Sequence, residues 1–394
     1  MFRISQFMRE IAEPTPLEPM PGPAGLVVIW NLIRRCNLNC RHCYSMSADT
    51  DFQGELTTNE VFAVLEDLKA FGVPALILSG GEPLLRPDIF EITARAKELG
   101  FFVALSTNGT LIDDGNIGAI AAAGYDYLGI SLDGIGPTHD RFRRKAGAFD
   151  SSLAAARRCR DAGIKVGLRF TLTIDNAAEL PDLLQLCNIE GIDRFYLSHL
   201  NYAGRGNRNR TDDTHLDTTR RAVDLLFDTA WSDARAGRKT EIVTGNNDAD
   251  GVYLLYWVRR HFPRLETHIR AKLVQWGGNA SGVNIANIDN SGAVHPDTMW
   301  WHHDLGNVRE QPFSEIWENG RDSLMVGLRR QPRHIGGRCG VCAYFDICGG
   351  NTRVRALQVT GDPWAEDPAC YLSDEEIGVE PTGAPRRRGG HAAA

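Results

Sequence analysis

The sequence predicts an α/β fold built on a sheet of six parallel strands, formed by residues 24–200. Six short apolar segments in this region alternate with helix-like segments, and such alternation is typical of parallel β-α-β units. The strands are mostly continuous apolar runs, as expected when helices cover both faces of a sheet. Six repeats are too few for an eight-stranded barrel. Two arrangements stay open, a three-quarter barrel, that is a partial (β/α)6 barrel, and an open parallel sheet.

Each element follows from a local signal. The apolar segments predict strands at 25–32, 74–79, 101–106, 125–132, 165–173 and 193–200. Helices are predicted between them at 57–72, 86–100, 113–124, 149–163 and 177–191. The first of these helices has Thr57 as a candidate N-cap, apolar residues at helical spacing and Gly72 at its end.

Polar and glycine-rich motifs follow the strands, at the edge where parallel α/β folds place their functional groups. Three cysteines follow the first strand, in the segment "CNLNCRHC". The motifs after the next three strands are GGEP (80–83), STNGT (106–110) and SLDG (131–134). Arg169 lies on the fifth strand, and YLSHL (196–200) forms the sixth. The sequence therefore predicts one functional site at this edge.

The rest of the chain divides into four further regions. Residues 1–23 predict an N-terminal arm that ends in a proline-rich stretch, and 201–277 a helical connecting region with a long helix at 214–237. Residues 278–378 predict a smaller domain with a hairpin signal, "ANIDNSGAVHPD", and a helix at 313–330. The low-complexity tail, 379–394, predicts disorder.

Charge and cysteine usage exclude several classes of protein. The net charge of −7 argues against a general nucleic-acid binder. No apolar run approaches the roughly 20 residues of a membrane span, and the N-terminus lacks the apolar core of a signal peptide. We therefore expect a cytoplasmic protein. In that reducing compartment its nine cysteines are expected as metal ligands or catalytic groups rather than disulfides.

The three cysteines Cys36, Cys40 and Cys43 have the spacing C-x3-C-x2-C. A closed structural metal site needs four ligands. One interpretation is a zinc knuckle with a distant fourth ligand, such as His42 or His139. The favoured interpretation is a 4Fe–4S cluster held by three thiolates, with one iron open to a ligand.

A second group, Cys339, Cys342, Cys348 and Cys370, offers a complete set of four thiolates. A structural zinc site is the simpler alternative to an iron–sulfur cluster here. Cys159 and Cys187 fall within predicted helices and are expected in the core.

The cysteine triplet, GGEP, STNG and SLDG together resemble the radical S-adenosylmethionine (SAM) superfamily over residues 24–200. The resemblance implies that Cys36, Cys40 and Cys43 hold a catalytic cluster, that SAM binds the open iron, and that its cleavage gives a 5′-deoxyadenosyl radical. It also implies a set of contacts to SAM. These are Gly80, Gly81 and Glu82 at the methionine amino group, Ser106, Asn108 and Ser131 near the ribose, Arg169 at the carboxylate, and His42 beside the adenine.

The second cysteine group resembles the auxiliary-cluster domain of the SPASM or twitch type. The resemblance implies one auxiliary 4Fe–4S cluster held by Cys339, Cys342, Cys348 and Cys370. The sequence departs from the usual pattern because "GAVHPD" has Asp297 where a cysteine is usual, and Thr352 lies where another would be. Asp297 or His295 as a ligand is the less favoured option.

Further segments, "MFRISQFM", "TGNNDADG" and "HPDTMWWHHDLGNVREQPFSEIW", resemble the radical enzymes of haem d1 biosynthesis. That resemblance implies removal of propionate side chains from 12,18-didecarboxysirohaem, with electrons from a flavodoxin or ferredoxin. Aromatic and cationic groups suit such a substrate. The candidates are Trp300, Trp301, His302, His303, Arg205, Arg208 and Arg210. Equally, the tryptophans could be core residues and the arginines a solvated loop.

Three alternatives remain. A haem-pathway homologue would convert the same tetrapyrrole to iron-coproporphyrin by removing acetates. A peptide-modifying SPASM enzyme usually has an N-terminal leader-binding domain, and residues 1–23 are expected to be too short for one. A non-enzymatic iron–sulfur or zinc carrier would not need Glu82, Asn108 and Arg169 at strand ends.

Overall fold

One ten-stranded sheet forms the centre of the molecule, and the computed structural model describes residues 1–16 and 25–379. The strands are β1 (Val27–Asn31), β2 (Ala75–Ser79), β3 (Phe102–Thr107), β4 (Tyr127–Ser131), β5 (Val166–Leu172), β6 (Arg194–His199), β7 (Glu241–Gly245), β8 (Ile285–Ile288), β9 (Ala293–His295) and β10 (Gly306–Asn307). Their order is β10-β9-β8-β1-β2-β3-β4-β5-β6-β7. All neighbours from β8 to β7 are parallel, whereas β9 and β10 pair antiparallel.

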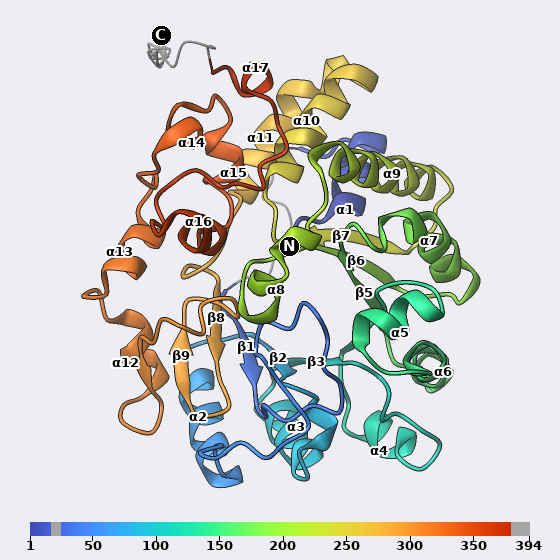
Figure 1. Cartoon of the computed structure of the whole chain (residues 1–394), viewed down its shortest axis with the longest axis vertical. Helices are drawn as coiled ribbons and strands as arrows, with labels where there is room; N and C mark the ends of the chain where they lie inside the picture. The colour runs from blue at the N-terminus through green and yellow to red at the C-terminus, as the bar shows by residue number, and fades with distance from the viewer. Residues whose placement is uncertain (17–24, 380–394) are drawn as a thin grey trace.

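Helices connect the parallel strands and lie outside the arc that β1 to β7 form in Figure 1. In the first part of the chain they are α1 (Ile4–Ala12), α2 (Thr58–Ala70), α3 (Ile89–Glu98), α4 (Ile117–Ala122), α5 (Pro137–Arg143), α6 (Ala148–Asp161), α7 (Leu180–Ile189), α8 (Gly204–Arg208) and α9 (Leu216–Arg235). Short 3-10 turns are η1 (Pro83–Leu85), η2 (Ala177–Glu179), η3 (Arg210–Asp212) and η4 (Pro263–Leu265). The predicted α/β class and the partial barrel with six β/α repeats are confirmed.

The C-terminal part is mostly helical, and its strands β8 and β9 extend the sheet beyond β1, as Figure 1 shows. Its helices are α10 (Ala249–His261), α11 (Glu266–Trp276), α12 (Phe313–Glu318), α13 (Ser323–Arg329), α14 (Gly337–Val341), α15 (Phe345–Cys348), α16 (Arg353–Thr360) and α17 (Asp374–Ile377). The single helix predicted at 313–330 is wrong: the chain breaks between α12 and α13, where the Asp322 side chain accepts from the Met325 N–H and starts the second helix.

The sheet contains more strands than predicted. The strand β7 adds to β6 within the predicted helical connecting region, and β8 pairs with β1 from within the predicted C-terminal domain. The hairpin signal is confirmed, since β8 and β9 pair antiparallel around Asp289 to Gly292. The hairpin joins the barrel sheet instead of standing apart, so the two predicted domains share one sheet.

The N-terminal arm contains a helix that the sequence prediction did not include. Phe2 pairs with Thr244 of β7 through two backbone hydrogen bonds of 2.7 and 2.8 Å. Helix α1 then buries Ile4, Phe7, Met8 and Ile11 against the core. The arm therefore covers the edge strand β7, which would otherwise expose unpaired backbone groups. Residues 17–23 of the predicted arm and residues 380–394 of the predicted tail lie outside the described residues.

The strands alternate between two faces. Residues such as Trp30, Leu78 and Leu128 are fully buried against the outer helices, and residues one position away point to the inner face. The inner face carries Asn31 opposite Ser79 and Ser131 opposite Arg169. The polar side chains of the strand ends thus gather inside the arc. In the described part of the chain, no helix combines the length and apolar character that crossing a membrane requires.

Candidate functional site

The three cysteines of the first motif lie in the loop directly after β1. Cys36 and Cys40 are each 7% exposed and pack around Leu38, with Cys43 against the same cluster. The Cys36 N–H donates to the Ala48 carbonyl oxygen at 3.0 Å, which closes the base of this cysteine loop (residues 36–48). The structure thus brings the three predicted thiols together at the carboxyl edge of the sheet.

The two glycines of GGEP contact the backbone that leads into Cys36. The Gly81 N–H donates to Ile33 O at 2.6 Å, and the Glu82 N–H donates to Arg35 O at 2.9 Å. A Cβ on Gly81 would lie 2.1 Å from Arg35 O, and one on Gly80 would lie 2.4 Å from Ile33 O. Only glycine permits this approach. Gly80 and Gly81 therefore fix the backbone at the start of the cysteine loop.

Glu82 is fully buried, and both of its carboxylate oxygens accept hydrogen bonds. Oε1 accepts from Thr107 Oγ1 at 2.7 Å, and Oε2 accepts from the Asn108 N–H at 2.8 Å. Burial raises the pKa of Glu82, against the effect of these donors. The side chain joins the loops after β2 and β3. Its predicted contact with an amino group stays a prediction.

Asn108 faces the cysteine loop. Its Nδ2 donates to Asn37 Oδ1 at 2.9 Å and lies 3.9 Å from the Cys36 sulfur. Its Oδ1 accepts from the N–H and hydroxyl of Thr110. This residue of STNG therefore orients the segment that carries Cys36.

Ser106, Ser131 and Arg169 share the inner face of the sheet. The Arg169 guanidinium reaches across β4 and donates to Ser106 Oγ at 2.6 Å. Gly129 makes this path possible, because a Cβ there would lie 2.3 Å from Arg169 Nε. No carboxylate pairs with Arg169 among the described residues. The structure brings together these three predicted residues and leaves a cation available inside the barrel.

A buried ion pair beside Cys40 was not predicted from the sequence. Arg143 of α5 pairs with Asp133 of the SLDG motif, and its Nη1 lies 3.4 Å from the Cys40 sulfur. Asp133 Oδ1 also accepts from the Thr171 N–H at 2.7 Å. The aspartate in SLDG was the available signal, but its partner lies on a helix that the sequence prediction did not contain.

His139 and His42 are both close to this pair. His139 Nδ1 accepts from the Asp133 N–H at 2.9 Å, and burial lowers its pKa to about 3. The His42 ring lies 4.6 Å from that of Phe142, and its buried Nδ1 has no hydrogen-bond partner in the structure. Burial, together with the Arg143 and Arg205 charges, lowers the pKa of His42 well below its usual value. Both rings are therefore neutral, and His42 offers an aromatic face next to Cys43.

Helix α8 supports the other side of the cysteine loop. The Arg205 side chain donates to Cys40 O at 2.7 Å and to Ser47 O at 2.9 Å. Its N–H donates to Cys43 O at 2.9 Å. Arg208 and Arg210, by contrast, are exposed. Of the three arginines predicted to meet the substrate, Arg205 is engaged in holding the cysteines.

The donor set of the loop fits a cluster with three protein ligands. Each thiol has a polar neighbour within 4.0 Å, namely Asn108 for Cys36, Arg143 for Cys40 and Ser45 for Cys43. Burial raises the pKa of Cys36 to about 12 and also raises that of Cys40. Thiolate ligands must lose these protons, so cluster assembly releases protons. Across the described residues, no three His, Cys, Asp or Glu side chains converge as the ligands of a single metal ion would.

Cys339 of the second group lies on α14, Cys342 directly follows that helix, Cys348 ends α15, and Cys370 follows α16. Cys339, Cys342, Cys348 and Cys370 are all partly exposed and unbridged. Burial raises the pKa of Cys342 and of Cys370 to about 11. A Cβ on Gly278 would lie 2.2 Å from Cys348 O, so this glycine lets the loop before β8 contact the group. Cys348 interacts with the other three thiols, and their role as a set of four ligands stays a prediction.

The alternative ligands of the second group have other partners. An Asp297 oxygen accepts from the Ser281 hydroxyl, and the other accepts from the Met299 N–H at 2.7 Å. His295 Nδ1 lies 3.0 Å from the His303 carbonyl oxygen. Cys159 and Cys187 are fully or almost fully buried in α6 and α7, and this prediction is confirmed.

The TGNNDADG motif connects the barrel to the second cysteine group. Asn351 Nδ2 donates to Asn247 Oδ1 at 2.6 Å, and the Asp248 N–H donates to Asn351 Oδ1 at 2.8 Å. Asn247 Nδ2 donates to Ala369 O at 2.9 Å. These bonds reach the chain just after Cys348 and just before Cys370. The motif therefore fixes the second site against the end of β7.

The residues at 300–303, predicted as one aromatic cluster at the substrate, lie in different surroundings in the structure. Trp300 is 1% exposed and belongs to the core, His302 is exposed, and His303 Nε2 lies 2.9 Å from Asp322. Trp301 lies 6.2 Å from the Tyr44 ring and 5.8 Å from the Arg34 guanidinium. Its buried indole N–H has no hydrogen-bond partner in the structure. Only Trp301 of this cluster approaches the cysteine loop, through Tyr44 next to Cys43.

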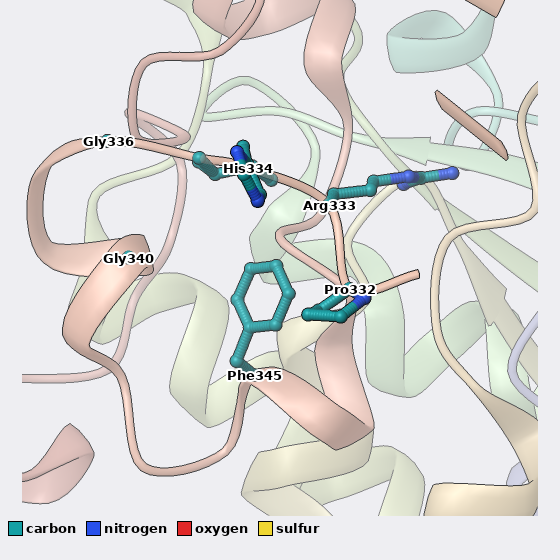
Figure 2. Close-up of a pocket in the computed structure, with 7 residues that line it drawn as sticks. Pro332, Arg333, His334, Gly336, Gly340 and Phe345 are labelled. Carbon is teal, nitrogen blue, oxygen red and sulfur yellow. The ribbon is translucent and has the colours of Figure 1, made fainter. Parts of the chain in front are cut away.

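A cavity of about 430 Å³ lies beside α14 and α15. Figure 2 shows His334 and Phe345 on two sides of it, with the Arg333 guanidinium pointing away from both. Its lining is Pro332, Arg333, His334, Ile335, Gly336, Gly340 and Phe345. The cavity is separate from the loop after β1.

Comparisons with known proteins agree with this geometry. A family model described as the radical SAM superfamily matches residues 30–187. The chain is 56% identical over 381 residues to the pre-heme d1 synthase of Dinoroseobacter shibae, across 96% of this chain and 94% of that protein. It is 44% identical over 355 residues to the Fe-coproporphyrin III synthase of Methanosarcina barkeri, across 89% of each.

Solved structures resemble the chain in fold. Streptococcus suis SuiB bound to its precursor peptide SuiA has a TM-score of 0.71 at 19% identity, over 89% of this chain and 76% of that one. The enzyme anSMEcpe with AdoMet and a peptide has a TM-score of 0.66 at 19% identity, over 89% and 94%. At such identities the likeness shows the fold alone. Because of the sequence relatives, the chain belongs to the radical SAM superfamily and is a radical SAM enzyme, a family that uses a 4Fe–4S cluster and S-adenosylmethionine.

Proposed function

We propose that the chain removes propionate side chains from 12,18-didecarboxysirohaem in haem d1 biosynthesis. One observation carries the proposal: 56% identity to a pre-heme d1 synthase extends over 96% of the chain. The similarity therefore includes the second cysteine group and the TGNNDADG segment as well as the barrel. Didecarboxysirohaem is the substrate that we infer, and a flavodoxin or ferredoxin is the inferred class of electron donor.

Cys36, Cys40 and Cys43 are the proposed ligands of the catalytic cluster. When bound, that cluster and S-adenosylmethionine supply a 5′-deoxyadenosyl radical for hydrogen abstraction. The chain holds the three thiols from two sides, with GGEP on one and Arg205 on the other. These contacts on both sides would hold the three thiols in fixed positions for the cluster. Rigid placement of reacting groups is a protein's main contribution to cofactor chemistry.

The inner face of the barrel offers the proposed contacts to S-adenosylmethionine. Arg169 is a cation without a carboxylate partner among the described residues, and a guanidinium binds a carboxylate strongly. Ser106 and Ser131 lie beside it on the same face. His42, a neutral ring next to Cys43, is proposed to pack on the adenine. Four further residues would act indirectly on S-adenosylmethionine binding, by fixing the loops beside its site. They are Gly80, Gly81, Glu82 and Asn108.

Trp301, Tyr44 and Arg34 are the proposed contacts to the macrocycle. Trp301 is partly exposed and lies near Tyr44, which follows Cys43. Arg34 has no carboxylate partner among the described residues, and its Nε donates to Ser45 O at 3.2 Å. A flat aromatic surface and a free cation suit a macrocycle that carries carboxylates. This set replaces Trp300, Arg208 and Arg210 as our candidates.

The second cysteine group is proposed to hold one auxiliary 4Fe–4S cluster through Cys339, Cys342, Cys348 and Cys370. The four thiols supply a full set of ligands. Asp297 is not needed, because hydrogen bonds within the chain engage both of its carboxylate oxygens. Within the described residues, His295 forms a hydrogen bond through Nδ1 only, and its buried Nε2 lies 3.7 Å from Asp289, so it stays the less favoured alternative ligand.

Mass spectrometry of the tetrapyrrole tests the proposal. The chain would be reconstituted with iron and sulfide without oxygen and then given S-adenosylmethionine, a reductant and didecarboxysirohaem. We expect 5′-deoxyadenosine together with a product that has lost propionate mass, and neither with Cys36→Ala. Formation of 5′-deoxyadenosine without any change in the tetrapyrrole would reject the substrate.

A second candidate function has its own observation. The 44% identity to an Fe-coproporphyrin III synthase favours removal of acetate groups from the same substrate. Loss of acetate mass in this experiment would establish that function and reject propionate removal.

A further inference from the structure

Three buried arginines lie around the second cysteine group, and among the described residues only one of them has a carboxylate partner. Arg333 is 4% exposed, Arg353 is 1% exposed, and Arg355 is 0% exposed. Arg355 binds Asp367 through two hydrogen bonds, of 3.0 and 2.9 Å. That pair has no net charge. The other two guanidiniums have no such compensation.

Arg353 directs its N–H groups at backbone carbonyl oxygens. Nη1 donates to Ala365 O at 2.5 Å and to Pro363 O at 3.2 Å, and Nη2 donates to Gly350 O. Arg333 does the same, with bonds to Leu328 O at 2.8 Å and to Asn279 O at 3.1 Å. In the described part of the chain, neither has an Asp or Glu within ion-pair distance.

Burying two positive charges near one another is unfavourable unless an anion lies nearby. Burial and the Arg353 charge lower the pKa of Arg333 to about 10. The groups that favour its charged form are Asp248, Cys348 and Asp297, but burial raises the pKa of both aspartates. Arg353 in turn interacts with the Cys339 thiol. The cysteine group is therefore the site where negative charge would meet these cations.

We propose that Arg333 and Arg353 are the countercharge of the auxiliary cluster and raise its reduction potential. The inference rests on the proposed auxiliary cluster. A 4Fe–4S core with four thiolates is a net anion and gains one more negative charge when it takes up an electron. Uncompensated positive charge close to the cluster favours that reduced form. Arg333 and Arg353 are positioning residues in this account and contact no substrate.

A redox titration of the isolated second site tests the proposal. The parent protein would be the full chain with Cys36, Cys40 and Cys43 replaced by alanine, reconstituted with iron and sulfide and followed by electron paramagnetic resonance. Arg353→Gln removes one charge, and we expect reduction to become about tenfold less favourable, a fall of about 59 mV. Arg353→Lys keeps the charge and should restore most of the potential.

The double variant Arg355→Gln/Asp367→Asn is the matched control. It removes a buried pair that has no net charge, although Asp367 lies near Cys339 and Cys370, so the potential should move much less than in Arg353→Gln even though stability falls. Equal shifts in the control and in Arg353→Gln would mean that loosened packing, not charge, sets the potential, and would overturn the proposal. An unchanged potential in Arg353→Gln with full iron content would overturn it as well.

Metal analysis of the parent protein separates the two levels of the inference. If the second site takes up zinc instead of iron, the auxiliary-cluster assignment and this proposal are both rejected. The proposed function of the first site would not be affected by that result. Where Arg353→Gln fails to fold, Arg333→Gln makes the same test, with the same expected direction.

Discussion

The two cysteine sites differ in how the chain treats the charge around them. Among the described residues beside the three-cysteine loop, Arg143 contacts a thiol and is neutralised by Asp133, while Arg205, which donates to Cys40 O, has no carboxylate partner. Around the four-cysteine group, Arg333 and Arg353 stay without a carboxylate. A guanidinium paired with a carboxylate changes the reduction potential of a nearby cluster little, whereas an unpaired one makes the cluster a better electron acceptor. For the guanidinium next to each set of thiols, we therefore predict the larger charge effect at the second site.

They also differ in how they are held. Backbone contacts from two separate loops fix the first site, and the contacts at Gly80 and Gly81 admit no side chain. The second site is joined to the barrel through the amide side chains of Asn247 and Asn351 and by one such glycine contact, at Gly278. Because the first site has more of these contacts and holds the proposed catalytic ligands, we expect its variants to show the larger effects.

Replacing Cys36 should have the largest effect. Cys36→Ala removes one of three proposed ligands, so S-adenosylmethionine cleavage should fall to the background level, measured as 5′-deoxyadenosine by chromatography. Iron bound by the second site should persist. Cys159→Ala, which removes a buried core thiol, is the control and should keep cleavage. Normal cleavage by Cys36→Ala would contradict the ligand assignment.

Gly81→Ala should loosen the first site. The new Cβ would lie 2.1 Å from Arg35 O, and overpacking of this kind costs about 1–3 kcal/mol. We expect that loss in the free energy of unfolding in urea, together with poorer cluster uptake. Gly118→Ala in α4 is the control, because nothing lies within 4 Å of its Cβ. That variant should gain about 0.5–1 kcal/mol, and equal losses in both would reject the steric argument.

Asp133→Asn should leave an unpaired arginine charge beside the first site, as Arg333 and Arg353 are proposed to do beside the second. It leaves the Arg143 charge beside Cys40 without its partner. Reduction of the catalytic cluster should become about tenfold more favourable, or about 59 mV higher. Electron paramagnetic resonance during a redox titration measures this shift. The double variant Asp133→Asn/Arg143→Gln should return toward the native value, and an unchanged potential in the single variant would count against the role of charge.

Trp301→Leu should have a smaller effect, confined to the substrate. Losing an aromatic contact worth about 0.5–1.5 kcal/mol should raise KM for the tetrapyrrole by roughly two- to tenfold. The yield of 5′-deoxyadenosine without substrate should not change. His302→Ala, at an exposed neighbouring position, is the control. Equal KM values for Trp301→Leu and the native enzyme would remove Trp301 from the substrate site.

The smallest effect is expected in acid, at a contact between the two halves of the chain. Arg309 and the capping box at Thr57 lower the pKa of Glu60 to about 2 from 4.5. The stability that Glu60 adds is present above pH 4.5 and is lost as the pH falls toward 2. Urea unfolding across this window should show a shallower pH dependence for Glu60→Gln. Identical pH profiles would show that this exposed contact contributes nothing.

Much of the barrel follows from local sequence, because each strand and each helix start has its own signal. The site residues Cys36, Gly81 and Asn108 were found by their places at strand ends. Other features depend on partners far along the chain. Arg205 meets the cysteine loop after 165 residues, and Asn351 meets Asn247 after 104.

Charge compensation is the clearest example of what a sequence does not show. Arg353 and Arg355 are two residues apart and equally buried, yet only the second faces Asp367. Helix α1 shows a different limit. Its apolar residues had helical spacing, but the strand that they cover, β7, was not predicted.

Transfer of deuterium from the substrate tests the proposed function most directly. Didecarboxysirohaem that carries deuterium in its propionate side chains would be converted by the native enzyme, and the 5′-deoxyadenosine would be analysed by mass spectrometry. If the radical attacks the propionates, deuterium should appear in the 5′-deoxyadenosine as the tetrapyrrole loses propionate mass. Unlabelled 5′-deoxyadenosine alongside a product that has lost acetate, or alongside unchanged substrate, would contradict the account.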